Sequence, residues 1–174
     1  MVTNEAVERG SARALLSDFI ALTKPRVMSL LLVSAIAGAF LGAGSTPTFT
    51  VIVAVLVGGA LASGGAASLN MAYERELDRQ MGRTKNRPVA EGRISARSAV
   101  LFGIALNVAA FIVLVLLTNV LAASLALAGT ALYFGLYTVI LKRTTTQNIV
   151  VGGAAGAVPP LVGYAAAAGT VDLS

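Results

Sequence analysis

The residues with the clearest chemical potential lie in one polar stretch, Asn70 to Pro88, between long apolar segments. Within it, Asn70, Glu74 and Asp78 follow one another at intervals of four residues. In a helix this spacing places one amide and two carboxylates on a single face, and Glu76 on the other side. Mg²⁺ is usually held by one or two carboxylates together with waters and a substrate phosphate. The spacing therefore suits a metal ion that bridges the protein to a diphosphate.

Three basic residues follow the acids, at Arg83, Lys85 and Arg87. The guanidinium group is a planar fork that matches phosphate oxygens, so these side chains are candidates for direct diphosphate contacts. The alternative is a solvated helix whose acidic and basic side chains form i,i+4 pairs. In that case the basic residues serve only to set the orientation in a membrane. The spacing alone leaves both interpretations open.

The composition identifies the setting of this polar stretch as a membrane. The chain is 56% hydrophobic and 12% charged, with a mean hydropathy of +0.82, whereas soluble domains carry about 25% charged residues. These values are typical of an integral membrane protein. The chain contains no Cys and no His. This excludes disulfides, a zinc or iron–sulfur site, and an imidazole acting as acid, base or haem ligand within these residues.

Uncharged runs predict an all-α, polytopic transmembrane helical bundle. Residues 27–73 and 98–141 carry no charge, and each run is too long for a single span of about 20 residues. Small and polar residues divide the first run at 42–48, and Thr118 and Asn119 divide the second. A further apolar run follows residue 148 and contains Pro159 and Pro160, which predict a kink. We therefore expect five spans, at 27–43, 49–69, 99–117, 120–141 and 149–168.

The remaining segments complete the predicted organisation. Residues 1–26 form an N-terminal tail in which 11–22 are expected to be a short amphipathic helix at the membrane interface. Residues 27–174 form a partial transmembrane domain with a polar loop at 70–97. Glycines in the second and fifth spans are expected to let helices approach closely. Five spans that end outside, with no polar tail, predict the N-terminal portion of a longer chain.

The distribution of charge predicts the orientation. With five spans, the tail, the 70–97 loop and the 142–148 loop share one side of the membrane, and together they hold all 13 Lys and Arg residues. The positive-inside rule places that side in the cytoplasm. As a separate expectation, the membrane is the plasma (inner) membrane of a bacterium. The net charge of +5 is thus explained by topology, without nucleic acid.

Three sequence blocks resemble a known family of membrane enzymes. The polar stretch, Asn70-xxx-Glu74-x-Glu76-x-Asp78-xx-Met81-x-Arg83-Thr84-xx-Arg87-Pro88, resembles the first acidic motif of the intramembrane prenyltransferases of the UbiA superfamily. Within that superfamily it is most similar to the farnesyltransferases that convert haem B to haem O. The segment around Lys24-Pro25-Arg26 resembles the start of the family's first helix. The block from Tyr137 through Lys142, Arg143 and Asn148 to Pro159, Pro160 and Gly163 resembles its fourth and fifth helices.

The resemblance implies a fold, a reaction and a set of roles. It implies about nine helices and transfer of a farnesyl group from farnesyl diphosphate to a vinyl group of haem B. It also implies a Mg²⁺ cofactor, the lipid bilayer as the setting, and haem A synthase as a partner. The predicted catalytic and metal-binding residues are Asn70, Glu74 and Asp78, and the predicted diphosphate-binding residues are Arg83, Lys85 and Arg87. Further candidate substrate contacts are Arg26, Tyr137, Lys142, Arg143 and Asn148, whereas Tyr73 is expected in the cavity or at the interface.

The sequence departs from the family pattern at two points. The family usually has Asp where this chain has Glu74 and Glu76, and the longer side chain predicts monodentate or shifted coordination. The family's second Asp-rich motif, in a later cytoplasmic loop, has no counterpart in these residues, so this chain is expected to supply one half of the site and to be inactive alone. Two alternatives stay open: a UbiA-type prenyltransferase that acts on an aromatic quinone precursor, and a membrane transport or structural subunit.

Overall fold

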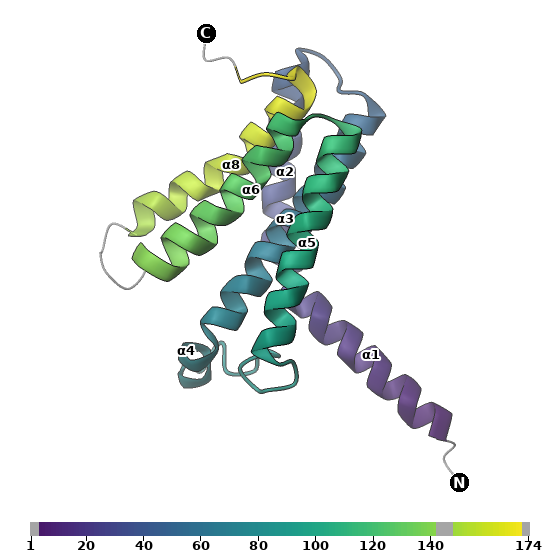
Figure 1. The fold of residues 1–174 in the computed structure, drawn as a ribbon, viewed down its shortest axis with the longest axis vertical. Helices are drawn as coiled ribbons and strands as arrows, with labels where there is room; N and C mark the ends of the chain where they lie inside the picture. The colour runs from purple at the N-terminus through teal and green to yellow at the C-terminus, as the bar shows by residue number, and fades with distance from the viewer. Residues whose placement is uncertain (1–3, 142–147, 172–174) are drawn as a thin grey trace.

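The computed structural model describes residues 4–141 and 148–171, and the side chains of 12–141 and 152–171. These residues form an all-helical bundle, as the sequence predicts (Figure 1). Its elements are α1 (Asn4–Leu22), α2 (Pro25–Ala43), α3 (Phe49–Tyr73), α4 (Arg75–Gln80), α5 (Ala96–Leu117), α6 (Val120–Thr130), the π-helix η1 (Ala131–Leu141) and α8 (Asn148–Ala168).

Four of the predicted spans are confirmed as helices that are long and apolar enough to cross a membrane. They are α2, α3, α5 and the continuous helix made by α6 and η1, Val120–Leu141. The breaks expected at 42–48 and 118–119 are present as the connections 44–48 and 118–119, and the first is shorter than predicted because α2 continues to Ala43. At the place of the predicted fifth span the structure has α8, which continues through Pro159 and Pro160. The membrane crossing of α8 stays a prediction.

Polar side chains begin the transmembrane helices where the sequence breaks the apolar runs. The Thr48 hydroxyl accepts a hydrogen bond from the Val51 amide before α3, and the Ser95 hydroxyl accepts one from the Ser98 amide before α5. The Asn119 side chain does the same for the Ala122 amide, at 2.9 Å, before α6. Each bond satisfies one of the amides that a helix leaves unpaired at its first turn. The residue at which each of these helices starts is therefore determined by the local sequence.

Glycines hold the helix pairs of the bundle at short distances, as expected. On α3, a Cβ added to Gly65 would lie 2.7 Å from the carbonyl oxygen of Gly103 on α5. Between α2 and α8, a Cβ at Gly38 would collide with the backbone of Pro160, and one at Gly163 with the carbonyl of Ala35. Such contact between backbones replaces the hydrophobic driving force that is missing between helices in lipid.

Large apolar side chains cover the outer faces of the bundle. Leu30, Leu41 and Leu116 are exposed by 72%, 75% and 76%. Exposed apolar surface on this scale is unfavourable in water but suits a surface that faces lipid. Together with the four apolar helices it identifies a membrane protein.

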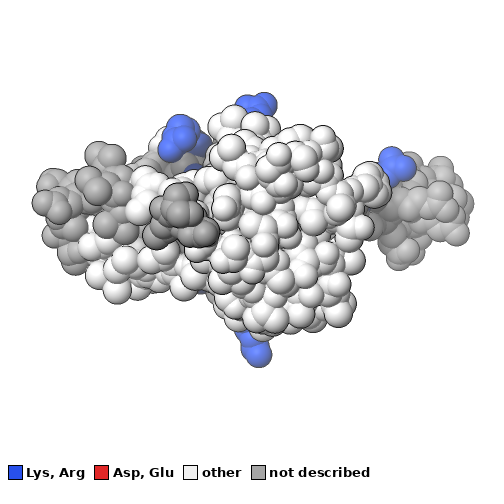
Figure 2. Space-filling view, turned by 90° about the horizontal axis from the view of Figure 1, so that it is seen from above, with Lys and Arg blue, Asp and Glu red and all other residues white. Residues whose placement is uncertain are grey.

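The charged side chains gather at one end of the bundle. All Lys and Arg residues whose side chains the structure describes lie within residues 13–26 and 75–97. In Figure 1 these segments include α4 and the lower end of α5, next to the lower end of α3, whereas the 44–48 and 118–119 connections lie at the top. The view onto that opposite end shows an almost uncharged surface, with a few basic side chains at its margin (Figure 2). The predicted one-sided distribution of charge is thus present in the fold.

Helix α1 projects from this charged end and contacts the bundle through its last turns (Figure 1). The ring of Phe19 packs edge-on against Phe102 at 5.0 Å, and Asp18 pairs with Arg93 at 3.0 Å. Leu15, Leu16 and Ile20 are exposed. The predicted helix at 11–22 therefore exists and begins earlier, at Asn4, while its position on a membrane stays a prediction.

Candidate functional site: a polar mouth above an apolar chamber

The end of α3 brings the three predicted metal ligands onto one buried face. Helix α3 ends at Tyr73 and α4 begins at Arg75, with Glu74 between them. The helical hydrogen bonds nevertheless continue, since the Glu74 amide donates to the Asn70 carbonyl and the Asp78 amide to the Glu74 carbonyl. Asn70, Glu74 and Asp78 are only 3%, 6% and 3% exposed. The predicted helical register is therefore kept across the break.

Asn70 connects the acidic face to the π-helix. Its Nδ2 donates to Oε2 of Glu74 at 3.0 Å, and its Oδ1 accepts from the Thr138 hydroxyl at 2.9 Å. The same hydroxyl lies 3.0 Å from the Tyr133 carbonyl oxygen, five residues earlier in η1. Because π-helices are rare and often mark functional sites, this link between α3 and η1 points to the same region as the acidic residues.

Asp78 is paired with Arg87 rather than left to repel Glu74. Both carboxylate oxygens of Asp78 accept from Nη1 of Arg87, at 2.8 and 2.7 Å. The Thr84 hydroxyl donates to the Asp78 carbonyl at 3.2 Å. These bonds fix the path of the loop after α4 against the helix end. Glu76 points to the other side, as expected, in exposed ion pairs with Arg75 and Arg79.

A cavity of about 370 Å³, the polar mouth, opens beside this face. Asn70 and Glu74 line it from α3, and Arg87 lines it from the loop that follows α4. The other lining residues are Lys24, Tyr133, Tyr137 and Gly152. One carboxylate, one amide and two cationic side chains thus converge on a single space. This set of groups suits an anion that is held by basic side chains and through a metal ion.

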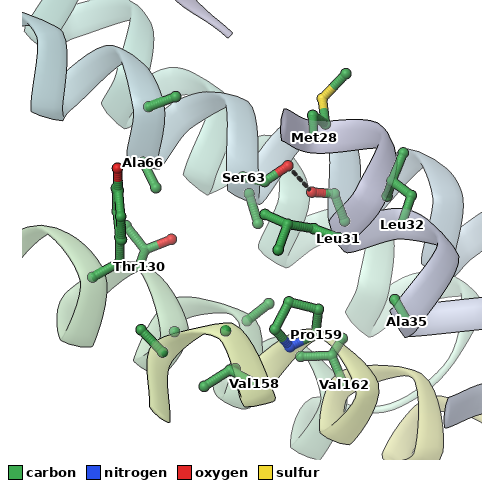
Figure 3. A pocket seen from close by; sticks show the side chains of 18 of the residues that line it. Met28, Leu31, Leu32, Ala35, Ser63, Ala66, Thr130, Val158, Pro159 and Val162 are labelled. Atoms are coloured by element: carbon green, nitrogen blue, oxygen red, sulfur yellow. Dashed lines mark hydrogen bonds between the residues drawn. The ribbon is translucent and has the colours of Figure 1, made fainter. Parts of the chain in front are cut away.

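A second cavity, the apolar chamber, has a volume of about 260 Å³ and is lined by α2, α3, α6, η1 and α8. Figure 3 shows Met28, Leu31 and Leu32 on one side of it and Val158, Pro159 and Val162 on another. The hydroxyl of Ser63 donates to the Gly59 carbonyl, and that of Thr130 donates to the Asn107 side chain. The hydroxyl protons of Ser63 and Thr130 are therefore already used within the protein.

The mouth and the chamber share Lys24, Tyr133 and Gly152, which we call the neck. A ligand could therefore place a charged group in the mouth and extend an apolar chain into the chamber. An allylic diphosphate has this division into a dianionic or trianionic head and a hydrocarbon tail. Ligand sites in proteins are typically apolar cavities with a few converging polar groups, and the joined cavities have this form.

The other predicted site residues divide between the mouth and the surface. Arg87 and Tyr137 line the mouth, and the ring of Tyr137 stacks on that of Tyr133 with centroids 5.8 Å apart. Arg26, Arg83 and Lys85 are exposed and line neither cavity; Tyr73 packs against Phe134 and also lines neither. Lys142 and Arg143 lie outside the described residues. Asn148 begins α8, and its side chain is likewise outside the described part.

Sequence reasoning did not select Lys24 or Tyr133. Among the described residues, Lys24 is the only non-glycine residue with a positive φ (φ 51°, ψ 62°). It stands directly before Pro25. A residue before proline is restricted to extended conformations, and a strained backbone of this kind is often found at functional sites. The Lys24-Pro25 pair in the sequence could therefore have indicated that Lys24 belongs to the site. Tyr133 lies four residues before Tyr137, so helical spacing could have indicated that the two rings share a face.

Comparison with known proteins agrees with this geometry. The sequence model of the UbiA prenyltransferase family matches residues 31–174, which include α3, α6, η1, α8 and most of α2, while Lys24 and the first turn of α2 lie before the match. The chain belongs to the UbiA prenyltransferase family. The match favours a prenyltransferase over a transporter or structural subunit, and the roles of the mouth and the chamber stay predictions. No solved structure matches the chain.

Curated proteins similar to this chain include several named protoheme IX farnesyltransferase. The chain is 50% identical over 169 residues to the one from Thermus thermophilus, covering 97% of this chain and 28% of the relative. It is 47% identical over 161 residues to that of Chloroflexus aurantiacus, covering 92% and 27%. It is 44% identical over 168 residues to that of Symbiobacterium thermophilum, covering 97% and 56%. The chain thus spans between about a quarter and a half of the length of these relatives.

Proposed function

We propose that this chain forms the diphosphate-binding part of a farnesyltransferase that joins farnesyl diphosphate to a vinyl group of haem B, giving haem O. The observation that supports the proposal most directly is the neck, where a polar mouth lined by Glu74, Asn70 and Arg87 meets an apolar chamber. The names of the relatives support haem rather than an aromatic quinone precursor as the acceptor.

The diphosphate would lie in the mouth. Arg87 can offer the edge of its guanidinium that Asp78 does not occupy, and Lys24 adds a second cation from the start of α2. When the C1–O bond of the substrate breaks, its electron pair moves to the diphosphate. Cationic groups that are already fixed in place stabilise this developing charge without reorganisation. Asp78 then acts as a positioning residue, because its two oxygens orient Arg87.

The mouth offers Mg²⁺ only some of the ligands that it needs. The described residues contain no group of three acidic side chains that could hold a metal by themselves. Mg²⁺ however usually takes one or two carboxylates and completes its shell with waters and substrate phosphates. Glu74 and Asn70 would hold it here, and Asp78 would do so only by giving up its bonds to Arg87. When bound, the ion would neutralise the leaving diphosphate as a Lewis acid.

The chamber would protect the reactive farnesyl group. An allylic cation is captured by water unless its surroundings are dry and apolar, and closed sites exclude such side reactions. The haem vinyl group then forms a C–C bond with C1. Water adds to the resulting cation on the haem side and releases a proton, which completes the hydroxyethylfarnesyl group. We place this chemistry at the cytoplasmic face of a bacterial plasma membrane, since the mouth lies at the charged end of the bundle.

The proposal is tested with the full-length gene product in nanodiscs, supplied with haem B, radiolabelled farnesyl diphosphate and Mg²⁺. The expected product is haem O. Glu74→Gln is expected to reduce turnover by at least about 100-fold, because a ligand to the neutralising metal contributes several kcal/mol to the transition state. The matched control Glu76→Gln, on the opposite and exposed side of the same segment, should keep turnover near that of the wild type.

Two results would overturn the proposal. A protein that ignores haem B but prenylates an aromatic acid would retain the family assignment and refute the acceptor. Wild-type turnover by Glu74→Gln would refute the metal-binding role of the mouth, because Glu74 is the only carboxylate among its described lining residues.

A further inference from the structure

The neck contains one aromatic ring, and its position suggests a role in the reaction. Tyr133 lines both the polar mouth and the apolar chamber. Among the described residues that form the chamber wall, it is the only aromatic side chain. The other neck residues are Lys24, whose charge suits the diphosphate, and Gly152, which has no side chain. The ring is therefore the group at the junction that can interact with carbon.

The junction is where the reacting carbon of the substrate must lie. If the diphosphate occupies the mouth and the hydrocarbon tail occupies the chamber, the C1 atom that joins them falls at the neck. Breaking the C1–O bond leaves positive charge on the allylic carbons C1 to C3 while the electron pair departs with the diphosphate. The charge thus develops beside Tyr133, where the mouth meets the chamber.

The surroundings of Tyr133 fix the ring rather than its hydroxyl. The ring stacks on Tyr137 at 5.8 Å with an interplanar angle of 21°. The backbone carbonyl of Tyr133 accepts from Thr138, which also donates to Asn70. The structure shows no hydrogen bond from the Tyr133 hydroxyl to a described residue. The ring is therefore oriented through packing and backbone contacts that a phenylalanine could also make.

We propose that the face of the Tyr133 ring stabilises the allylic cation at the neck and keeps water from it until the acceptor attacks. A cation over an aromatic face gains about 0.5–1 kcal/mol at exposed sites and about 2 or more when water is excluded. No covalent bond to Tyr133 forms, and the leaving diphosphate takes the electron pair. This inference rests on the proposed function and assigns the residue that faces the reacting carbon.

The test compares Tyr133→Phe with Tyr133→Leu in the full-length gene product, with haem B and farnesyl diphosphate. Tyr133→Phe should retain turnover. Tyr133→Leu should lower kcat by about 10- to 30-fold, with KM for farnesyl diphosphate nearly unchanged. It should also raise the ratio of farnesol to haem product, because water captures a cation that is no longer shielded. The matched control Tyr73→Leu, whose ring lines neither cavity, should keep both turnover and product ratio.

The outcomes separate this inference from the proposed function. A wild-type protein that makes neither haem O nor farnesol refutes the function itself. An active wild type in which Tyr133→Leu keeps the product ratio of Tyr133→Phe refutes the role of the ring. Equal losses in the two variants also overturn it, because the hydroxyl would then be the active group. Thermal unfolding of both variants shows whether a loss of kcat comes from the fold, and the farnesol ratio is independent of the amount of folded protein.

Discussion

Substitutions in the ion pair between Asp78 and Arg87 test whether Asp78 stabilises the fold and orients Arg87, or binds a metal ion. Nη1 of Arg87 reaches both oxygens of Asp78, and the two side chains are 23% and 4% exposed. We expect Asp78→Asn and Arg87→Met each to destabilise the full-length gene product. We expect the double variant to lose less than the two single losses together, since its members no longer leave a buried charge unpaired.

The magnitude follows from burial and geometry. Removing one member of a buried ion pair typically costs about 3–5 kcal/mol, mainly because the other charge stays buried and unpaired. Arg87 retains some contact with solvent, and asparagine can still accept one hydrogen bond, so about 2 kcal/mol is expected for Asp78→Asn. This is roughly a 30-fold change in the unfolding equilibrium constant. The coupling energy between the two positions should be about 1–2 kcal/mol.

The assay is reversible unfolding in mixed micelles, carried out as a double-mutant cycle. The control cycle uses Glu76→Gln and Arg79→Met, which remove an ion pair of 3.0 Å whose side chains are 61% and 50% exposed. Its coupling energy should stay at or below about 0.5 kcal/mol, as for other exposed i,i+3 and i,i+4 pairs. The two cycles therefore differ in burial while sharing the same segment and the same kinds of charge.

A coupling energy near zero for Asp78 and Arg87 would refute this reasoning. If Asp78→Asn in addition raised the Mg²⁺ concentration needed for half-maximal turnover, Asp78 would belong to the metal site, as the sequence first predicts. Retention of the Mg²⁺ dependence together with lost stability would instead support the positioning role.

Two further predictions concern glycines of α8, with Gly153 as the matched control because no atom of the described residues lies within 4 Å of its added Cβ. Gly163→Ala should destabilise the protein by about 1–3 kcal/mol in the same unfolding assay, since the new methyl group meets the Ala35 carbonyl. Gly153→Ala should leave the stability unchanged. Equal stability of the two variants would contradict the close α2–α8 contact. Gly156 lines the chamber, so Gly156→Leu should shorten it and shift kcat/KM from farnesyl toward geranyl diphosphate. Unchanged selectivity relative to Gly153→Leu would show that the chain does not extend past Gly156.

The spans and the register of the site could be predicted because each depends on local sequence. A charge is expensive in lipid, so uncharged runs mark the spans, and the polar breaks coincide with the connections at 44–48 and 118–119. The four-residue spacing places Asn70, Glu74 and Asp78 on one face even though α3 ends at Tyr73, because the backbone hydrogen bonds continue. Neither prediction required knowledge of which helices are neighbours.

The partners of these residues could not be predicted, because they depend on tertiary structure. Arg83, Lys85 and Arg87 look equivalent in sequence, yet only Arg87 lies against Asp78 and in the mouth, since the loop after α4 turns back on the helix end. Lys24 precedes the mouth residues by dozens of positions and joins them through a left-handed backbone at the start of α2. The π-helix that presents Tyr133 likewise has no recognisable sequence pattern here.

The pairing of Asn70 with Glu74 also bears on why glutamate can stand where the family resemblance implies aspartate. Side chains on a helix lean toward its N-terminus, so a longer acid at position 74 reaches back over the preceding turn. Here Oε2 of Glu74 meets Nδ2 of Asn70 at 3.0 Å, and Asn70 is itself held by Thr138 of η1. A shorter aspartate would leave this carboxylate farther from the amide. The extra methylene therefore lets one oxygen hold the α3–η1 connection, while Asp78, one turn later, orients the cation that faces the same mouth.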